Sequence, residues 1–593
     1  MAPPANEFVF HGIPASPGIA IGSALILSKN EFSVEQKTIA SANVEKEIEK
    51  FHEALSKTRT QIQELQSKIQ RILSEKDSKI FDAHLLIIDD KILMDEIENT
   101  VRKEKSNIDF VFSKTIQRYI VAISSIEDKY FRERATDIKD VAERILKNLH
   151  GLDDVFLDHL PGERIIIAHD LAPSDTAGLD RDNVLAFSTE SGSRTSHTAI
   201  MARSMQIPAV VGIQGNILST IKSGDLVIVD GHTGKLILNP TPETLANYAE
   251  KETKELKFYE EILKEGNLRP ETLDGFRIQL AANIDKQDEV ANARIFGAAG
   301  VGLFRTEYLL INSERVPSEE EQFTVYSELA AAMEGQPVII RTFDVGGDKL
   351  SDIITPHHET NPFLGCRAVR LFRDHIDILV DQLRAIIRAS ALGNIKIMFP
   401  MISTVEEVEE LNRIIKGIKE ELSSRKILFN PKIEIGIMIE IPSAALNADA
   451  LAQRVDFFSI GTNDLVQYTM AVDRTNEKVA YLYQPANPAI LKLIKNIIAS
   501  ARKHKIWVSV CGEMAGDPRY TPLLLGLGIH ELSMTPASIG PIRRLIRSLK
   551  IHDTHKLVEK SLAATSAKEV ITMCEDLISK AAPDLINLAG TGD

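Results

Sequence analysis

Eight short apolar segments alternate with helix-like segments over the C-terminal half of the chain. In order, they are FRIQLAANI, GVGLFRTE, PVIIRTFDVGG, IKIMFPMI, IEIGIMIEIPSAA, VDFFSIGTNDL, IWVSVCGEMAG and IHELSMTP. This alternation predicts parallel strands covered by helices, and a count of eight favours a closed (β/α)₈ barrel. An open doubly wound sheet is the alternative, but no dinucleotide-binding fingerprint follows an early strand.

The N-terminal part contains a long helical stretch flanked by β-rich pieces. Residues 41–149 are almost free of Gly and Pro, and their apolar residues recur at three- and four-residue steps from Val44 to Ile72, which is the helical period. We expect a helical bundle here, with a coiled-coil spacer as the alternative. Residues 1–40 and 150–240 carry short strand-like pieces, which predicts an α/β domain interrupted by the bundle.

The two parts are joined by a charged stretch without internal Gly. Residues 241–266 are predicted to form a semi-rigid helical arm. Residues 267–593 form the predicted barrel, with a pair of surface helices and a frayed tail after about residue 550. The expected fold class is therefore a multidomain α/β protein that ends in a TIM-type barrel.

The composition limits the possible functions. The chain has 593 residues and a net charge of -15, which argues against nucleic acid as the main partner. A basic protein partner suits this charge, although acidity also serves solubility. The sequence has no apolar run near the ~20 residues of a membrane span, no signal peptide and no disulfide framework among its three cysteines. We expect a cytoplasmic protein that does not insert into membranes.

Arginines and carboxylates cluster where the predicted barrel strands end, which is where such barrels place their active sites. The residues at these ends are Arg305, Glu307, Arg341, Asp344, Arg367, Met398, Glu440, Asn463, Asp464, Arg474, Cys511 and Glu513. Four arginines suit an anion with several oxygens, because guanidinium matches carboxylate and phosphate. Glu440 and Asp464 suit Mg²⁺. For any single residue, a salt bridge that closes the rim is the alternative.

Two further residues are candidates for covalent or proton chemistry. Cys511 is either a small core residue or, at the mouth of the site, a group that exchanges a proton. His197 lies in SGSRTSHTAIMARSMQIPAVVG, behind several hydroxyl side chains. We expect an N-cap near Thr195 or Ser196 and a helix that ends before Pro208. Hydroxyls at a helix N-terminus favour a dianion, and an imidazole nitrogen can carry a phosphoryl group.

The motifs closely resemble those of Enzyme I of the bacterial sugar phosphotransferase system, over essentially the whole chain. They are YFRERATDIKDV, LAPSDTAGL, SRTSHTAIMARS, GLFRTE, RTFDVGGDK, NPFLGCRA, MFPMI, SIGTNDLVQYTMAVDR and CGEMAGD. Two small departures are Cys366 in NPFLGCRA, where an aromatic residue is expected, and the serine before Arg194 in place of a glycine. Neither departure affects a catalytic motif.

The resemblance implies a kinase-type transfer of the phosphoryl group of phosphoenolpyruvate to a histidine and then to the phosphocarrier protein HPr, with release of pyruvate. It implies a swivelling phosphohistidine domain in residues 1–40 and 150–240, HPr binding by residues 41–149, and a barrel that binds phosphoenolpyruvate and forms a homodimer. Because the histidine and the barrel lie in different domains, we expect the histidine domain to swing about the 241–266 arm.

The resemblance also implies a role for each site residue. His197 is the phosphorylated nucleophile, supported by Thr176. Substrate is bound by Arg305, Arg341, Arg367, Asn463, Asp464 and Arg474. Glu440 and Asp464 ligate Mg²⁺, and Cys511 protonates the enolate carbon as pyruvate forms.

Three other functions fit the sequence less well. A dikinase that makes phosphoenolpyruvate from ATP needs a nucleotide-binding region with a Gly-rich phosphate loop, for which there is neither room nor motif. A nitrogen-regulatory paralogue is expected to carry a sensory domain before residue 1. A catalytically dead phosphorelay scaffold is disfavoured by the intact His197, Glu440, Asp464 and Cys511.

Overall fold

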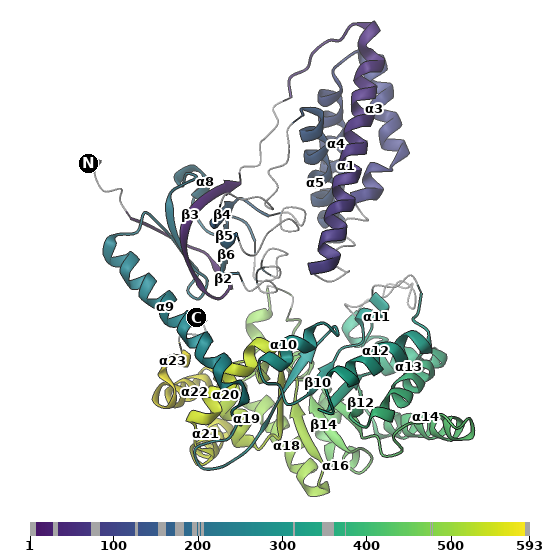
Figure 1. The fold of residues 1–593 in the computed structure, drawn as a ribbon, viewed down its shortest axis with the longest axis vertical. Coiled ribbons are helices and arrows are strands. Elements are labelled where there is room, and N and C mark those ends of the chain that lie inside the picture. Colours follow the sequence, from purple (N-terminus) through teal and green to yellow (C-terminus); the bar gives the residue numbers. More distant parts are fainter. Residues whose placement is uncertain are drawn as a thin grey trace. The chain divides into compact units, whose positions relative to one another are not determined.

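The computed structural model of the protein describes residues 7–27, 34–72, 84–124, 129–151, 162–171, 183–192, 199, 202, 207–311, 315–346, 361–373, 375–474, 476 and 478–586. The chain divides into two compact units (Figure 1), one of Met1–Glu255 and the other of Leu256–Gly590. We describe each unit by itself.

A helical bundle fills the segment predicted to be helical. Its long helices are α1 (Val44–Ile72), α3 (Lys91–Glu104), α4 (Ile108–Ser124) and α5 (Lys129–Leu149). Their apolar faces share one core, in which Phe51 and Phe112 are fully buried with ring centroids 5.6 Å apart. The helices therefore pack on one another, as a bundle requires, and the coiled-coil alternative is wrong.

An eight-stranded mixed sheet forms from the two flanking segments. Its strands are β1 (Phe8–His11), β2 (Ile13–Ser16), β3 (Ile19–Leu27), β4 (Arg164–Ala168), β5 (Val184–Thr189), β6 (Ala209–Val211), β7 (Leu226–Asp230) and β8 (Lys235–Leu238), in the order β1-β8-β7-β3-β4-β5-β6-β2. In β4, Ile166 enters one core while Ile165 and Ile167 enter another. Burial of both faces explains why this strand is continuously apolar. Strands β7 and β8 pair antiparallel as a hairpin.

The segment around the candidate nucleophile is described in part. Thr176, His197 and the expected N-cap lie outside the described residues. Ala199 and Ala202 are helical and fully buried in the core that also contains Phe187. This agrees with the predicted helix before Pro208, because two residues three positions apart lie on the same helix face.

The eight predicted strands of the second unit form a closed parallel barrel. They are β9 (Gln279–Ile284), β10 (Val301–Phe304), β11 (Val338–Arg341), β12 (Ile395–Phe399), β13 (Ile435–Ile439), β14 (Phe457–Ile460), β15 (Trp507–Val510) and β16 (Glu531–Met534), and β16 pairs with β9 to close the ring. The open-sheet alternative is therefore wrong. The structure confirms the TIM-type fold read from the eightfold alternation.

Helices surround this barrel (Figure 1). They are α10 (Glu289–Ile295), α11 (Tyr308–Ile311), α12 (Glu319–Ala332), α13 (Ile376–Ala389), α14 (Val405–Ser424), α15 (Pro442–Leu446), α16 (Ala448–Leu451), α17 (Thr462–Met470), α18 (Pro488–His504), α19 (Thr521–Leu527) and α20 (Pro536–Ser548). Capping boxes at Ser318 and Thr404 begin two of them, which satisfies backbone N–H groups at their first turns.

The C-terminal segment differs from the expected pair of surface helices. In the described part of this segment, up to residue 586, three helices follow the barrel: α21 (Ile551–Ala563), α22 (Ala567–Ala581) and α23 (Pro583–Ile586). Val570 and Cys574 of α22 are fully buried in the core of the second unit. The apolar face of α22 therefore belongs to the core, and the helix is more than a surface addition.

The charged stretch between the two parts is helical, as predicted. Helix α9 (Pro242–Lys264) contains Tyr248, whose hydroxyl donates to Asp230 at 3.2 Å, and Ile262, which packs against Gly540. Over the residues that the structure describes, no helix has both the length and the apolar character needed to cross a bilayer.

Candidate active site

The charged residues expected at the rim of the barrel come from the carboxyl ends of its strands. Arg341 is the last residue of β11, Arg305 follows β10, Glu440 follows β13 and Cys511 follows β15. Asn463 and Asp464 lie in the first turn of α17, directly after β14. Parallel strands bring these ends to one face.

A buried ionic network links three loops of this rim. The carboxylate of Asp344 accepts from Arg367 Nε and Nη2 at 2.8 Å each, and its Oδ2 lies 3.1 Å from Arg341 Nη1. Arg367 Nη2 also donates to Asp464 at 2.9 Å, and Arg341 Nη2 donates to Glu307 at 2.9 Å. Asp344 and Arg367 are respectively fully and almost fully buried, so their positions are fixed by strong charge-assisted bonds.

Each buried arginine keeps an unused donor. Arg341 Nε and Arg367 Nη1 are buried and have no acceptor among the described residues. A buried N–H without a partner is costly, and such exceptions call for an explanation. An anion with several oxygens at the rim would supply the missing acceptors.

The other two arginines are more accessible. Arg305 donates to Asp285 at 2.8 Å, and the two side chains are 40% and 50% exposed. Arg474 Nη1 lies 3.8 Å from Glu513 Oε1. Asn463 bonds twice to Glu513, donating to its side chain at 3.1 Å and accepting from its backbone N–H at 2.8 Å. These groups can change partner more easily than the buried pair.

Glu440 and Asp464 form the candidate metal site. Glu440 Oε1 accepts from the backbone N–H of Met401 at 2.6 Å, and a Cβ on Gly461 would stand 2.8 Å from Oε2, so the glycine keeps the space beside that oxygen clear. Burial, reinforced by the carboxylates of Asp464 and Asp344, raises the pKa of Glu440 well above its usual range, which a bound cation would reverse.

The donor set fits one hard cation. Among the described residues, no three or more His, Cys, Asp or Glu side chains gather as a complete metal cage. Mg²⁺ takes one or two carboxylates and completes its shell with water and substrate oxygens. Glu440 and Asp464 are therefore suited to it.

Cys511 lies inside the barrel. Its side chain is 4% exposed and packs in a cluster with Met398 and Met438. Burial raises the pKa of its thiol to about 11, so the thiol keeps its proton at neutral pH. Cys511 is therefore a core residue, and its protonated thiol also lies close to charged groups, including Arg341 and Glu440.

The structure brings the predicted rim residues together and pairs the arginines with carboxylates. From the sequence, the four arginines are predicted to bind an anion, and a salt bridge at the rim is the alternative for any single residue. In the structure, Asp344 and Glu307 neutralise Arg341 and Arg367, and Asp285 pairs with Arg305.

Sequence reasoning missed three residues of this region. Asp285 and Asn283 come from the end of β9, and Asn283 donates to the carbonyl of Cys511 at 2.9 Å. The same rule of reading strand ends would have found both. The contribution of Met401 is its backbone N–H, which carries no residue-type signal.

Family models match three parts of the chain. They are described as PEP-utilising enzyme, N-terminal, over residues 11–134; PEP-utilising enzyme, mobile domain, over 160–234; and PEP-utilising enzyme, PEP-binding domain, over 260–551. The last match contains all the rim residues described above. The second contains His197 and Thr176.

Similar proteins match almost the whole chain. A phosphoenolpyruvate-protein phosphotransferase of Geobacillus stearothermophilus is 43% identical and covers 97% of this chain and 99% of its own length. Another, of Haemophilus influenzae, is 41% identical over 96% and 98%, respectively. A solution structure of an Enzyme I protein (nEIt) is 43% identical, covers 41% of this chain and 98% of its own, and has a TM-score of 0.37.

The buried and accessible arginines are predicted to differ in their effect on stability. Arg367→Met should lower the free energy of unfolding by about 3–5 kcal/mol, because it leaves buried carboxylates short of a partner. Arg305→Met should change it by less than about 1 kcal/mol, because its ion pair is half-exposed. Chemical denaturation of both variants measures this. Equal losses would contradict the assignment of Arg367 to a buried structural network.

Proposed function

This chain belongs to the phosphoenolpyruvate-protein phosphotransferase family, and on that premise we propose that it transfers the phosphoryl group of phosphoenolpyruvate to His197 and then to a histidine of HPr, releasing pyruvate. The chain is a transferase, and its C-terminal unit carries the PEP-binding domain. The acceptor HPr, the released pyruvate and the residue roles below are our proposal.

The unused donors of the two buried arginines are the observation that carries this proposal. Arg341 Nε and Arg367 Nη1 are buried without an acceptor among the described residues, and their positions are fixed by Asp344. Phosphoenolpyruvate carries a phosphate and a carboxylate, whose oxygens suit guanidinium N–H groups. Donors held in place before substrate arrives stabilise the charge of a phosphoryl group in transfer.

The accessible groups complete the proposed substrate site. Arg305, Arg474 and Asn463 now bond to Asp285 and Glu513, and we propose that they exchange these partners for substrate oxygens. Glu440 and Asp464 would hold Mg²⁺, which when bound neutralises phosphate charge. Asp464 would also contact substrate.

The chemical steps follow from the groups present. We propose that a ring nitrogen of His197, assisted by Thr176, attacks phosphorus in line, so that the P–O bond to the enol oxygen breaks and the enolate of pyruvate leaves. The thiol of Cys511 then gives its proton to the methylene carbon of the enolate. Its raised pKa keeps this proton in place until the carbanion-like carbon appears, and water returns the proton to the thiolate afterwards.

We propose the following division of labour along the chain. Residues 1–40 and 150–240 carry the phosphohistidine, and residues 41–149 bind HPr. Residues 241–266 act as the arm about which the histidine domain moves, and residues 267–593 bind phosphoenolpyruvate and form the homodimer. The match to a mobile domain over residues 160–234 supports the proposal that the phosphohistidine domain moves.

Labelled phosphoenolpyruvate tests the proposed acceptor. With Mg²⁺ and donor labelled in the phosphate, the full chain should take up acid-labile, alkali-stable label, which should pass to added HPr. His197→Ala should take up none. His169→Ala, a change of another histidine in the same unit that pairs with Glu190, should leave labelling unchanged. Acid-stable label, or label retained by His197→Ala, would refute the proposal.

Replacement of the thiol tests the proton donor. Cys511→Ala should slow pyruvate release in the presence of HPr and Mg²⁺ by about 10²–10⁴-fold, the range expected for loss of a general acid. Cys574→Ala removes another buried free thiol and should leave the rate unchanged. A Cys511→Ala rate within about threefold of the parent would remove Cys511 from the mechanism, because general-acid loss costs far more.

A further inference from the structure

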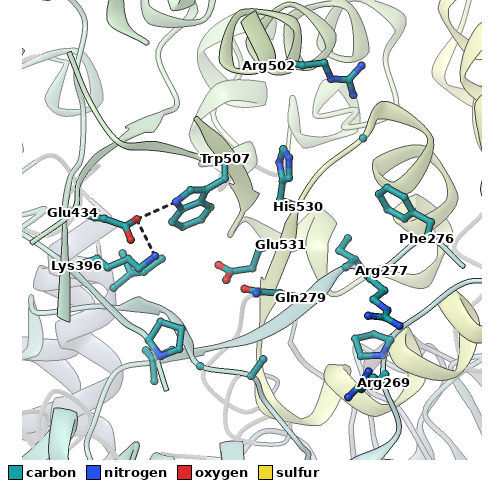
Figure 2. Close-up of a pocket in the computed structure, with 18 of the residues that line it drawn as sticks. Arg269, Phe276, Arg277, Gln279, Lys396, Glu434, Arg502, Trp507, His530 and Glu531 are labelled. Carbon is teal, nitrogen blue, oxygen red and sulfur yellow. Dashed lines mark hydrogen bonds and ion pairs between the residues drawn. The ribbon is translucent and has the colours of Figure 1, made fainter. Parts of the chain in front are cut away.

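A cavity, shown in Figure 2, lies at the end of the barrel opposite the charged rim, and apolar atoms make up most of its lining. Its volume is about 910 Å³, and its lining includes residues at the beginnings of strands: Gln279 of β9, Lys396 of β12, Trp507 of β15 and Glu531 of β16. Small-molecule sites have volumes of about 300–1,000 Å³. The cavity shares no residue with the proposed phosphoenolpyruvate site.

Glu531 is a buried acid without a partner in this cavity. Its side chain is 5% exposed, and its Oε1 has no hydrogen-bond partner among the described residues. Figure 2 shows its carboxyl group pointing into the cavity beside Gln279, the residue opposite it on β9. Burial raises the pKa of Glu531 to about 7. An unsatisfied buried acceptor of this kind is costly unless a ligand supplies a donor.

Lys396, whose charge acts on Glu531, is already paired with another carboxylate. Glu434 Oε2 accepts from Lys396 Nζ at 2.9 Å and from Trp507 Nε1 at 3.0 Å. Lys396 therefore has its own carboxylate, and Glu531 does not serve as its ion-pair partner. A ligand in the cavity would therefore have to supply the hydrogen-bond donor for the carboxyl group of Glu531.

Trp507 supplies a flat ring held in a fixed position, with Lys396 Nζ 4.5 Å from its centroid. Its ring is stacked on Phe457 with centroids 4.4 Å apart and planes 10° from parallel, and its N–H is bonded to Glu434. A rigid indole at the edge of a cavity favours planar ligands, because aromatic rings gain contact area at little entropic cost.

Arg502 and His530 give the same cavity a cationic and hydrogen-bonding edge. No carboxylate of the described residues forms an ion pair with Arg502. His530 Nδ1 accepts from the backbone N–H of Val508 at 3.1 Å, so a neutral ring carries its hydrogen on Nε2. Burial lowers the pKa of His530, and the charge of Arg502 lowers it further. The guanidinium of Arg502 is therefore available to an anionic group in this cavity.

We propose that this cavity is a second ligand site, which binds a small aromatic or heterocyclic anion. Its ring lies against Trp507, a ring hydroxyl or amino group donates to Glu531, and its carboxylate or phosphate is held by Arg502 and His530. A purely structural cavity would account for the stacked rings and for the Lys396–Glu434 pair. It would not account for the buried oxygen of Glu531 that has no hydrogen-bond partner among the described residues.

The single tryptophan of the chain makes binding directly measurable. Because Trp507 is the only tryptophan, fluorescence excited at wavelengths that only tryptophan absorbs reports on this cavity. We expect 4-hydroxybenzoate, used as the probe, to change the fluorescence of the full chain saturably in the presence of saturating phosphoenolpyruvate and Mg²⁺. Benzoate, which lacks the donor for Glu531, should bind at least about tenfold more weakly, the equivalent of one good hydrogen bond.

Matched variants test whether the probe binds in this cavity or is attracted non-specifically by the positive charge of the protein. Arg502→Gln and Glu531→Leu should each weaken probe binding by at least about tenfold, while Glu531→Gln, whose amide oxygen still accepts, should stay within about threefold. Arg425→Gln removes the same charge from an exposed arginine that pairs with Glu421 outside the cavity and should have no effect. Circular dichroism checks that each variant is folded.

Three results would overturn the proposal. The first is no saturable signal up to a probe concentration on the order of 10 mM, beyond which binding is too weak to be specific. The second is equal weakening by Arg502→Gln and Arg425→Gln. The third is competitive displacement of the probe by phosphoenolpyruvate, which would place the probe at the charged rim.

Discussion

The carboxylate of Asp344 holds the charged rim of the barrel together. It bonds to Arg367 through both oxygens and to Arg341 through one, in a place with no exposure to solvent. Breaking a buried pair leaves an uncompensated charge, so neither arginine can move without a large cost. The two guanidinium groups are therefore preorganised, and each still has a donor to offer. The proposed binding of phosphoenolpyruvate depends on this constraint.

The two ends of the barrel differ in how their charged groups are arranged. At the carboxyl ends of the strands, charged groups are packed closely and neutralise one another. At the opposite end, a buried acid, a flat ring and an arginine line a cavity of about 910 Å³. Between them lies an apolar layer that contains Met398, Met438 and Cys511. Because this layer excludes water, a thiolate at Cys511 would not be solvated. The thiol of Cys511 therefore keeps its proton.

The sequence predicted the barrel and most of its rim because both follow from periodic rules. Eight apolar segments separated by helices define the strands, and the residue after each strand faces the site. Asp285 was not predicted, because it lies one residue beyond the first predicted strand segment, FRIQLAANI. The pairing of Arg341 and Arg367 with Asp344 could not be read from the sequence, since it depends on how three loops meet. The same holds for the cavity at the opposite end of the barrel, because Glu531 and Trp507 begin ordinary apolar strands. His197 and Thr176 lie outside the described residues, so their roles stay predictions.

The most direct test of the charged rim is the affinity of the full chain for phosphoenolpyruvate with Mg²⁺, measured by calorimetry in a His197→Ala background so that no transfer accompanies binding. Arg305→Met should weaken binding by at least about tenfold, because a charge-assisted bond to substrate is lost. Arg294→Met removes an arginine that pairs with Glu334 away from the rim and should bind as the parent does. Equal affinity of Arg305→Met and its parent would contradict the account.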